Sequence, residues 1–246
     1  MANKFIDYFP KIVLFGDSFT QFSFSSDGFG TAISNHFQRK FDVINRGFSG
    51  YTTRSARLIL SKLLQNDNHP LGSIKAVTIL LGTNDCEMPS IPNSRHVPIS
   101  EYKENLTDIC EQFRKAGVSY ERQLLITPPP MNEDAWSEYC KAKGIPAGYR
   151  NENIRQYAVA CSTVGKNLCI EVIDLWGHDF AIAKDWNDML SDGLHFSAKG
   201  NNFLSQMLIP RLNYKLCNSY LVFPDWENVH PKEPSRTLGI TLDKFS

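Results

Sequence analysis

The chain has 246 residues, of which 42% are hydrophobic, and this length is enough to bury one sizeable core. Lysine and arginine together number 26, as do aspartate and glutamate, so the formal net charge of zero argues against a nucleic-acid partner or an anionic membrane surface. No run approaches the roughly 20 apolar residues of a membrane span, and the first residues lack the features of a secretory signal, so we expect a soluble cytoplasmic protein.

Short apolar runs alternate with segments of helical periodicity along most of the chain. Apolar runs of this length are typical of buried strands, and apolar residues spaced three and four apart are typical of amphipathic helices. In chain order, the predicted elements are a strand at 11–15, a helix at 31–40, a strand at 41–45, a helix at 53–65, a strand at 76–81, a helix at 100–116, a strand at 122–127, a helix at 151–164, a strand at 169–174 and a helix at 197–212.

These elements predict an α/β fold. The strand segments are mainly apolar rather than alternating, which is typical of a parallel sheet with helices on both faces. We therefore expect a three-layer α/β/α sandwich around a central, mostly parallel five-stranded sheet, in one domain over residues 1–220. Ser100 is the predicted N-cap of the helix at 100–116. Residues 87–98 are predicted to form a surface loop, and residues 221–246 an extended C-terminal arm.

The cysteines are scattered, with no CxxC pair and no histidine at metal-ligand spacing. We expect reduced thiols, several of them buried, and no metal site. The six are Cys86, Cys110, Cys140, Cys161, Cys169 and Cys217.

Four short polar clusters follow predicted strands or precede the last predicted helix. Ligand sites in open parallel sheets form at the carboxyl ends of the strands, so these clusters have a physical reason to meet. The first is Gly16-Asp17-Ser18. Ser18 is a candidate nucleophile whose N–H can also donate to an oxyanion, and Asp17 is expected to organise the turn. Taken alone, such a cluster is more often a turn or a helix N-cap.

The second and third clusters offer hydrogen-bond donors. Residues 45–50, NRGFSG, place two glycines in a short loop where a backbone N–H can face a ligand. Residues 82–85, GTND, include Asn84, whose side-chain amide can donate to a developing oxyanion. Each cluster by itself is equally typical of a loop or a strand-end turn.

The fourth cluster pairs Asp192 with His195 in the sequence DGLHF. An aspartate three residues before a histidine can bind one imidazole nitrogen and leave the other exposed as a base. The other five histidines have no comparable setting, and we expect them to be ordinary surface or core residues. An Asp-x-x-His pair alone is also a weak signal.

Taken together, the four clusters resemble the SGNH hydrolases in all four of that family's blocks, GDSFT, NRGFSG, GTND and DGLHFS. Within the family, the stretches GFSGYTTR and SDGLHFSAKG are most similar to the fungal isoamyl acetate-hydrolysing esterases. The resemblance spans roughly residues 11–212 and implies the flavodoxin-like SGNH fold. One difference is Gln21, which stands where that subgroup often has glutamate.

The resemblance also implies the site residues. Ser18 matches the nucleophile, Asp192 the acid and His195 the base. The oxyanion hole would be formed by the N–H of Ser18, by Gly50 and by Asn84. Gly47 is a less certain donor than Gly50.

The implied reaction is hydrolysis of short-chain carboxylic esters, such as isoamyl acetate, through an acyl-serine intermediate. It needs neither metal nor organic cofactor, and its partner is a small-molecule ester. Other possible activities on the same catalytic set are those of a thioesterase, a lysophospholipase or a carbohydrate deacetylase, and a catalytically silent binding protein is a more distant alternative. A nucleotide-binding protein is excluded, because the chain has no glycine-rich phosphate loop.

Two features of the sequence leave alternatives open. The arm at 221–246 is a candidate contact surface for a homodimer. Aromatic residues near the motifs form either an apolar pocket mouth or part of the core. They are Phe19, Phe22, Phe24, Phe48, Tyr51 and Phe196.

Overall fold

The computed structural model describes residues 9–66, 72–177, 180, 185–217 and 220–238. Five strands form one sheet, all of them parallel to their neighbours, in the order β2-β1-β3-β4-β5. The predicted α/β class and the five-stranded parallel sheet are therefore confirmed. The strands are β1 (Lys11–Gly16), β2 (Asp42–Gly47), β3 (Ile74–Leu80), β4 (Gln123–Ile126) and β5 (Glu171–Ile173).

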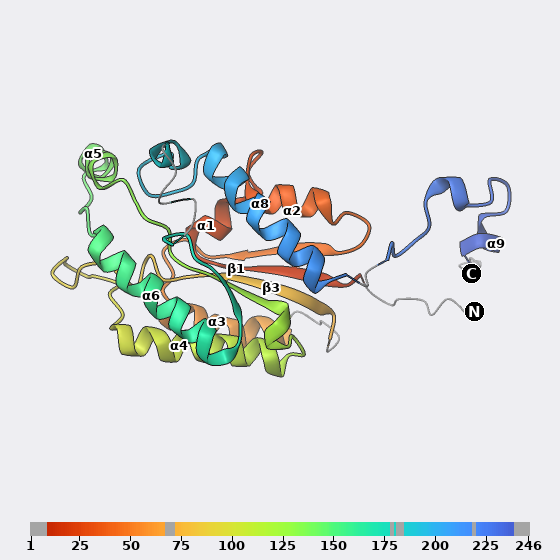
Figure 1. The fold of residues 1–246 in the computed structure, drawn as a ribbon, viewed down its shortest axis with the longest axis horizontal. Helices are drawn as coiled ribbons and strands as arrows, with labels where there is room; N and C mark the ends of the chain where they lie inside the picture. Colours follow the sequence, from red (N-terminus) through yellow and green to blue (C-terminus); the bar gives the residue numbers. More distant parts are fainter. Residues whose placement is uncertain (1–8, 67–71, 178–179, 181–184, 218–219, 239–246) are drawn as a thin grey trace.

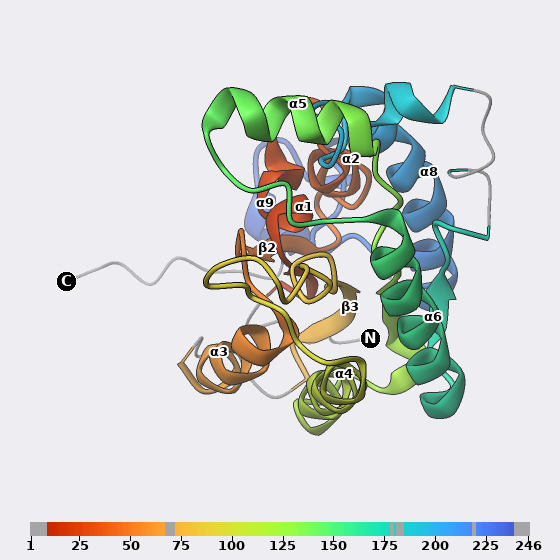
Figure 2. The same cartoon turned by 90° about the vertical axis from the view of Figure 1, so that its left-hand side faces the viewer.

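Helices cover both faces of the sheet, as the apolar strands predict (Figure 1). On one face α2 packs against α8, and on the other α4 packs against both α3 and α6. A short helix, α1, follows β1 directly, and α5 crosses above the carboxyl ends of the strands (Figure 2). The helices are α1 (Ser18–Gln21), α2 (Phe29–His36), α3 (Thr53–Asn66), α4 (Ile99–Lys115), α5 (Glu133–Lys143), α6 (Asn151–Leu168) and α8 (Ala198–Lys215).

The core fills the space between these layers. The strand side chains Ile12, Leu14 and Phe15 are completely buried. Phe15 meets Phe113 of α4 edge to face, with ring centroids 5.6 Å apart. Because both faces of β1 are covered, its end is a rigid base for whatever follows it.

Several predicted boundaries are wrong. The helix predicted at 31–40 is α2, which ends at His36. Ser100 is not an N-cap, because α4 already begins at Ile99 and its N-cap is Pro98. The strand predicted at 169–174 begins only at Glu171, since Cys169 ends α6 in a left-handed conformation with φ of 56°.

Helix α5 was not predicted, although both of its ends carry capping residues. The Asn132 side chain accepts the N–H of Ala135 at the start of the helix, and Gly144 ends it with φ of 66°. Only two of its side chains, Trp136 and Cys140, are buried. Such a narrow apolar stripe gives little helical periodicity in the sequence.

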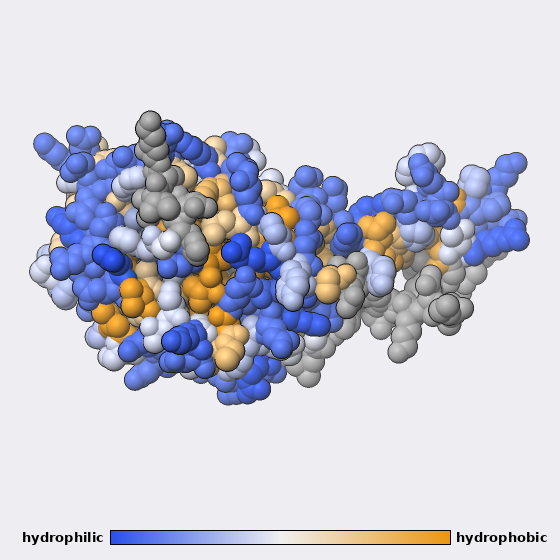
Figure 3. All heavy atoms as spheres, in the orientation of Figure 1, coloured by the Kyte–Doolittle hydropathy of each residue, from blue (hydrophilic) through white to orange (hydrophobic). Residues whose placement is uncertain are grey.

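Beyond α8, residues 220–238 project from the sheet domain (Figure 1). They contain a 3₁₀ turn, η4 (Trp226–Asn228), and a short helix, α9 (Pro234–Leu238), which the sequence did not predict. Arg39 joins this arm to the domain: its guanidinium pairs with Asp225 and donates to the carbonyl of Pro224 at 2.8 Å. The arm exposes apolar as well as polar surface (Figure 3).

No helix in the described part of the chain has the length and apolar character needed to cross a membrane. All six cysteines are free thiols, in agreement with the prediction. Four are buried and two, Cys169 and Cys217, are exposed.

Candidate active site

Ser18 lies directly after β1, at the first residue of α1. Asp17 organises this turn, as expected, because its Oδ1 accepts the N–H of Phe19 at 3.1 Å. Gly16 has no space for a side chain, since an added Cβ would lie 2.2 Å from Oγ1 of Thr20. The serine is therefore held by tightly packed backbone at the carboxyl edge of the sheet.

His195 lies beside Ser18, although 177 positions separate them in the chain. Its Nε2 is 3.0 Å from Oγ of Ser18, and its Nδ1 is 2.8 Å from Oδ2 of Asp192. The other oxygen, Oδ1, accepts the N–H groups of Leu194 and His195 at 2.9 and 2.8 Å. With Nδ1–H held by the carboxylate, the neutral imidazole presents an unprotonated Nε2 to the Ser18 hydroxyl.

The carboxylates near Ser18 differ in their electrostatic settings. Burial tends to raise the pKa of Asp192, but hydrogen bonds from the ring and backbone of His195 outweigh it and hold this pKa below its usual value. Asp17, completely buried, has its pKa raised to about 7 by loss of water. Burial likewise raises the pKa of Asp85 to about 6, although Thr53 donates to it. Asp192 is therefore the carboxylate best placed to stay charged beside an imidazolium.

Aromatic side chains surround the His195 ring. The ring centroids of Phe19, Phe22 and Trp136 lie 5.5, 5.8 and 6.2 Å from it. This packing restricts rotation of the imidazole and keeps Nε2 directed at Ser18.

The remaining histidines that the structure describes are not part of this contact. His36, His96 and His230 each hydrogen-bond elsewhere. His69 and His178 lie outside the described residues.

The three predicted oxyanion donors line the same cavity as the Ser18 hydroxyl. Gly50 has φ of 78°, in the left-handed region that favours glycine. Asn84 donates through Nδ2 to the carbonyl of Tyr51 at 3.1 Å, and its Oδ1 accepts the Tyr149 hydroxyl at 3.2 Å. Across the described residues, the backbone N–H groups of Ser18 and Gly50 have no protein acceptor, so both are available to a bound ligand.

Gly47 has a different role from Gly50. Its N–H donates to Oδ1 of Asn45 at 2.8 Å, so this donor is occupied. Its Cα packs against α1, where an added Cβ would lie 1.9 Å from the backbone nitrogen of Gln21. Gly47 therefore permits close packing of β2 against the segment that carries Ser18.

Gln21 joins the segment that carries Ser18 to the loop that carries Gly50. Its Oε1 accepts the N–H of Ser49 at 2.7 Å. The carboxylate of a glutamate is the same kind of acceptor, so glutamine at this position keeps the contact.

Comparison with known proteins identifies the family. Residues 14–203 match the model of the GDSL-like Lipase/Acylhydrolase family, and this range is most of the chain. The chain belongs to this family. It is accordingly an esterase or acylhydrolase.

Relatives of this GDSL-family chain match it over most of its length and are named as esterase homologs. Isoamyl acetate-hydrolyzing esterase 1 homolog of Rattus norvegicus is 41% identical over 229 residues, which cover 93% of this chain and 92% of the relative. The Homo sapiens homolog is 39% identical over the same lengths. These identities confirm the resemblance to isoamyl acetate-hydrolysing esterases.

Solved structures support the fold. A lipase/acylhydrolase from Enterococcus faecalis superposes with a TM-score of 0.64 at 23% identity, covering 86% of this chain and 98% of its own. An acetyl xylan esterase superposes with the same TM-score at 17% identity, covering 81% of this chain and 98% of its own. Both likenesses confirm the SGNH fold.

The GDSL-family site opens into a cavity of about 380 Å³. The aromatic side chains that line it, Trp136 and Tyr149, were not predicted, since one belongs to α5 and the other to a loop. The six aromatic residues near the motifs are not among the residues that line this cavity, although Phe22 is exposed beside the His195 ring. Phe19 and Phe196 are core residues instead, which is the alternative that the sequence left open.

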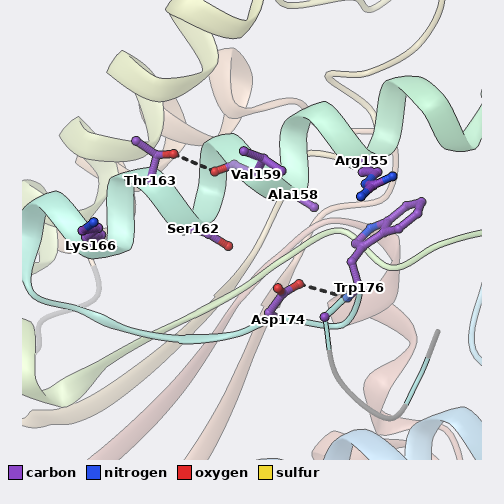
Figure 4. Close-up of a pocket in the computed structure, with 9 residues that line it drawn as sticks. Arg155, Ala158, Val159, Ser162, Thr163, Lys166, Asp174 and Trp176 are labelled. Atoms are coloured by element: carbon purple, nitrogen blue, oxygen red, sulfur yellow. Dashed lines mark hydrogen bonds between the residues drawn. The ribbon is translucent and has the colours of Figure 1, made fainter. Parts of the chain in front are cut away.

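A second hollow, of about 410 Å³, lies beside α6, away from the predicted site residues (Figure 4). Arg155 and Trp176 lie at one end of it, and Asp174 accepts the backbone N–H of Trp176 at 2.9 Å. None of Ser18, Gly50, Asn84, Asp192 and His195 lines it. Within the described residues, no group of three or more His, Cys, Asp or Glu side chains is arranged to hold a metal ion.

Proposed function

We propose that the chain is a serine esterase that hydrolyses short-chain carboxylic esters, such as isoamyl acetate, through an acyl-serine intermediate. One observation carries this proposal: Ser18, His195 and Asp192 form a continuous chain of contacts, with separations of 3.0 and 2.8 Å. The same order of nucleophile, base and acid activates serine in hydrolases on several unrelated folds.

In the proposed mechanism, Ser18 Oγ attacks the ester carbonyl while His195 Nε2 takes its proton. Asp192 keeps the ring oriented and stabilises the imidazolium. His195 then returns the proton to the departing alcohol, leaving an acyl-serine. Water attacks this acyl group with the same base, releasing the acid and restoring Ser18.

The charge on the carbonyl oxygen would be shared by the N–H groups of Ser18 and Gly50 and by the Asn84 side chain. Within the described part of the chain the two backbone donors have no protein acceptor, and Gly50 holds its conformation without strain. Loss of one such donor typically lowers kcat about 10²–10³-fold.

The size and lining of the cavity support a small ester as substrate. A volume of about 380 Å³ lies near the lower end of the range for ligand sites, which runs from about 300 to 1,000 Å³. Apolar side chains, among them Ile91, Trp136 and Leu194, line it together with the polar donors. The relatives named for isoamyl acetate hydrolysis favour the same class of substrate.

The test compares hydrolysis of p-nitrophenyl acetate, butyrate and octanoate by the wild type and Ser18→Ala, after circular dichroism has shown that both fold alike. We expect the highest kcat/KM on acetate and a loss of at least about 10³-fold in Ser18→Ala. Preference for octanoate would contradict the short-chain assignment. Activity that survives in Ser18→Ala would contradict the nucleophile.

We also propose that residues 1–220 form the catalytic domain and that the arm at 221–246 packs on a second copy of the chain. Trp226 in the arm is 81% exposed, and Phe223 is also exposed, as is Tyr220 at the end of the domain. Aromatic side chains at such exposure are typical of surfaces that become buried on association.

A further inference from the structure

A line of polar side chains runs from the rim of the cavity to Asn84. Glu87 pairs with Arg95, at 3.0 Å between Oε1 and a guanidinium nitrogen. The same nitrogen of Arg95 donates to the Tyr149 hydroxyl at 2.7 Å, and this hydroxyl lies 3.2 Å from Oδ1 of Asn84. All four residues line the cavity that holds Ser18.

The donors and acceptors that these side chains carry fix the direction in which each hydrogen bond is donated. Arginine has donors and no acceptor, so the Tyr149 oxygen must accept from Arg95. The single hydroxyl proton of Tyr149 is then left to point at Asn84. The Asn84 atom that receives it must be the carbonyl oxygen, because the amide nitrogen cannot accept. The NH₂ group of Asn84 therefore faces the opposite way, where it donates to the carbonyl of Tyr51 at 3.1 Å and to Oδ2 of Asp17 at 3.5 Å.

The line is anchored, and three of its four members are shielded from water, while Arg95 is exposed. Asn84, Tyr149 and Glu87 are 5%, 4% and 8% exposed. Glu87 accepts both the guanidinium and the backbone N–H of Arg95, the latter at 2.6 Å. Despite burial, these contacts keep the pKa of Glu87 below its usual value. A charged, doubly held Glu87 fixes Arg95, and Arg95 in turn fixes the Tyr149 hydroxyl.

We propose that Glu87, Arg95 and Tyr149 are positioning residues that hold the Asn84 amide with its NH₂ group toward the oxyanion. The NH₂ group is also held by the Tyr51 carbonyl at 3.1 Å and by Oδ2 of Asp17 at 3.5 Å, and Tyr149 adds a donor to the carbonyl oxygen. Without the Tyr149 proton, the Asn84 amide is held from the NH₂ side alone, so its direction toward the negative charge of the transition state is less firmly fixed. This inference rests on the proposed function, because it assigns a role in the same oxyanion hole.

The first experiment replaces only the hydroxyl, in Tyr149→Phe. The ring stays in place, so binding of the ester should change little while the transition state loses a fixed donor. We expect kcat to fall about tenfold, with KM unchanged within about twofold. Tyr157→Phe is the matched control, because it removes another buried hydroxyl, one that donates to the carbonyl of Val97. This control should keep the wild-type kcat.

A double-mutant cycle then separates positioning from a general structural loss. If Tyr149 acts only through Asn84, Tyr149→Phe should lower kcat about tenfold in the wild type and have no further effect in Asn84→Ala. Because the Tyr149 hydroxyl contacts Asn84, Tyr149→Phe should lower Tm less in the Asn84→Ala background than in the wild type. This comparison of Tm values does not require an active enzyme.

The outcomes distinguish this inference from the proposed function. Equal losses of kcat in both backgrounds, or an unchanged kcat in Tyr149→Phe, would overturn the positioning role while the Ser18-dependent activity stands. Absence of ester hydrolysis in the wild type would contradict the proposed function, and this role for Tyr149 with it.

Discussion

At the scale of single residues, Asp192 stabilises both its own loop and the imidazole. One carboxylate oxygen accepts two backbone N–H groups and the other accepts Nδ1–H of His195. Gly193, which lies between Asp192 and His195 in the sequence, has φ of 91°. An added Cβ there would lie 2.4 Å from the backbone nitrogen of Trp136. The turn that carries Asp192 and His195 is thus held from within by Asp192 and from outside by α5.

This arrangement predicts a pH-dependent contribution to stability. The pKa of Asp192 lies below its ordinary 3.8 in the folded chain, so the unfolded chain binds the proton more tightly. The carboxylate therefore contributes stability that is fully present above about pH 3.8 and is lost as the pH falls through the lower, folded pKa.

For Asp192→Asn we expect a free energy of unfolding about 1–2 kcal/mol below that of the wild type at pH 7. The difference should close below pH 3.8. Urea unfolding at a series of pH values checks this, with Asp188→Asn as a control on an exposed carboxylate. A difference that stays constant down to pH 3 would show that charge on Asp192 is not the cause.

The motif residues could be predicted from the sequence, whereas the residues that hold them in place could not. Ser18, Asp192 and His195 come together as predicted, because strand ends and the last loop lead to one edge of the sheet. Tyr149 and Arg95 were not foreseen. They lie in loops, and no local spacing marks a side chain whose partner is 54 residues away.

At the scale of elements, the position of Ser18 depends on how closely β2 and α1 approach. Gly47 permits this approach, because no side chain fits between its Cα and the Gln21 backbone. Asn45 strengthens the contact by donating to the carbonyl of Thr20 at 2.8 Å.

For Gly47→Ala we expect a loss of about 1–3 kcal/mol in the free energy of unfolding, because overpacking must displace backbone. Since the displaced segment carries Ser18, kcat should also fall about tenfold or more. Gly144→Ala is the comparison: nothing lies within 4 Å of its added Cβ, and only its φ of 66° is strained. That variant should lose about 1 kcal/mol and keep its kcat. Equal kcat in the two variants would contradict this account.

The elements themselves could be predicted wherever burial imposes a pattern. The strands β1 and β3 are mainly apolar because both faces are covered, so they stand out in the sequence. Helix α5 lies over the sheet edge and buries two side chains, which leaves too little pattern to predict it. Helix ends such as that of α2 depend on tertiary contacts rather than on local sequence.

At the scale of the whole molecule, the arm is the part least tied to the domain. Its contacts with the domain include those from Arg39 to Phe223, Pro224 and Asp225. Several of its aromatic side chains are exposed, whereas the core residues come from the sheet and the helices around it.

A chain truncated after Tyr220 should therefore keep the unfolding transition of the full chain within about 1 kcal/mol. Its mass in solution should fall to that of one copy if the arm holds a dimer together. Size-exclusion chromatography with light scattering gives the mass of both proteins. An unchanged oligomeric state would remove the proposed role of the arm.

The separation of Ser18 and His195 by 177 positions in the chain also affects how the protein folds to its active state. The first strand can pair with its neighbours early, but Ser18, the proposed nucleophile, meets His195 only when α8 has docked and brought the loop before it into place. Contacts between distant parts of a chain form slowly, since closing a long loop costs entropy before it is repaid. Recovery of hydrolysis during refolding would then follow the final stage of assembly, and a partly folded chain would carry an inert serine.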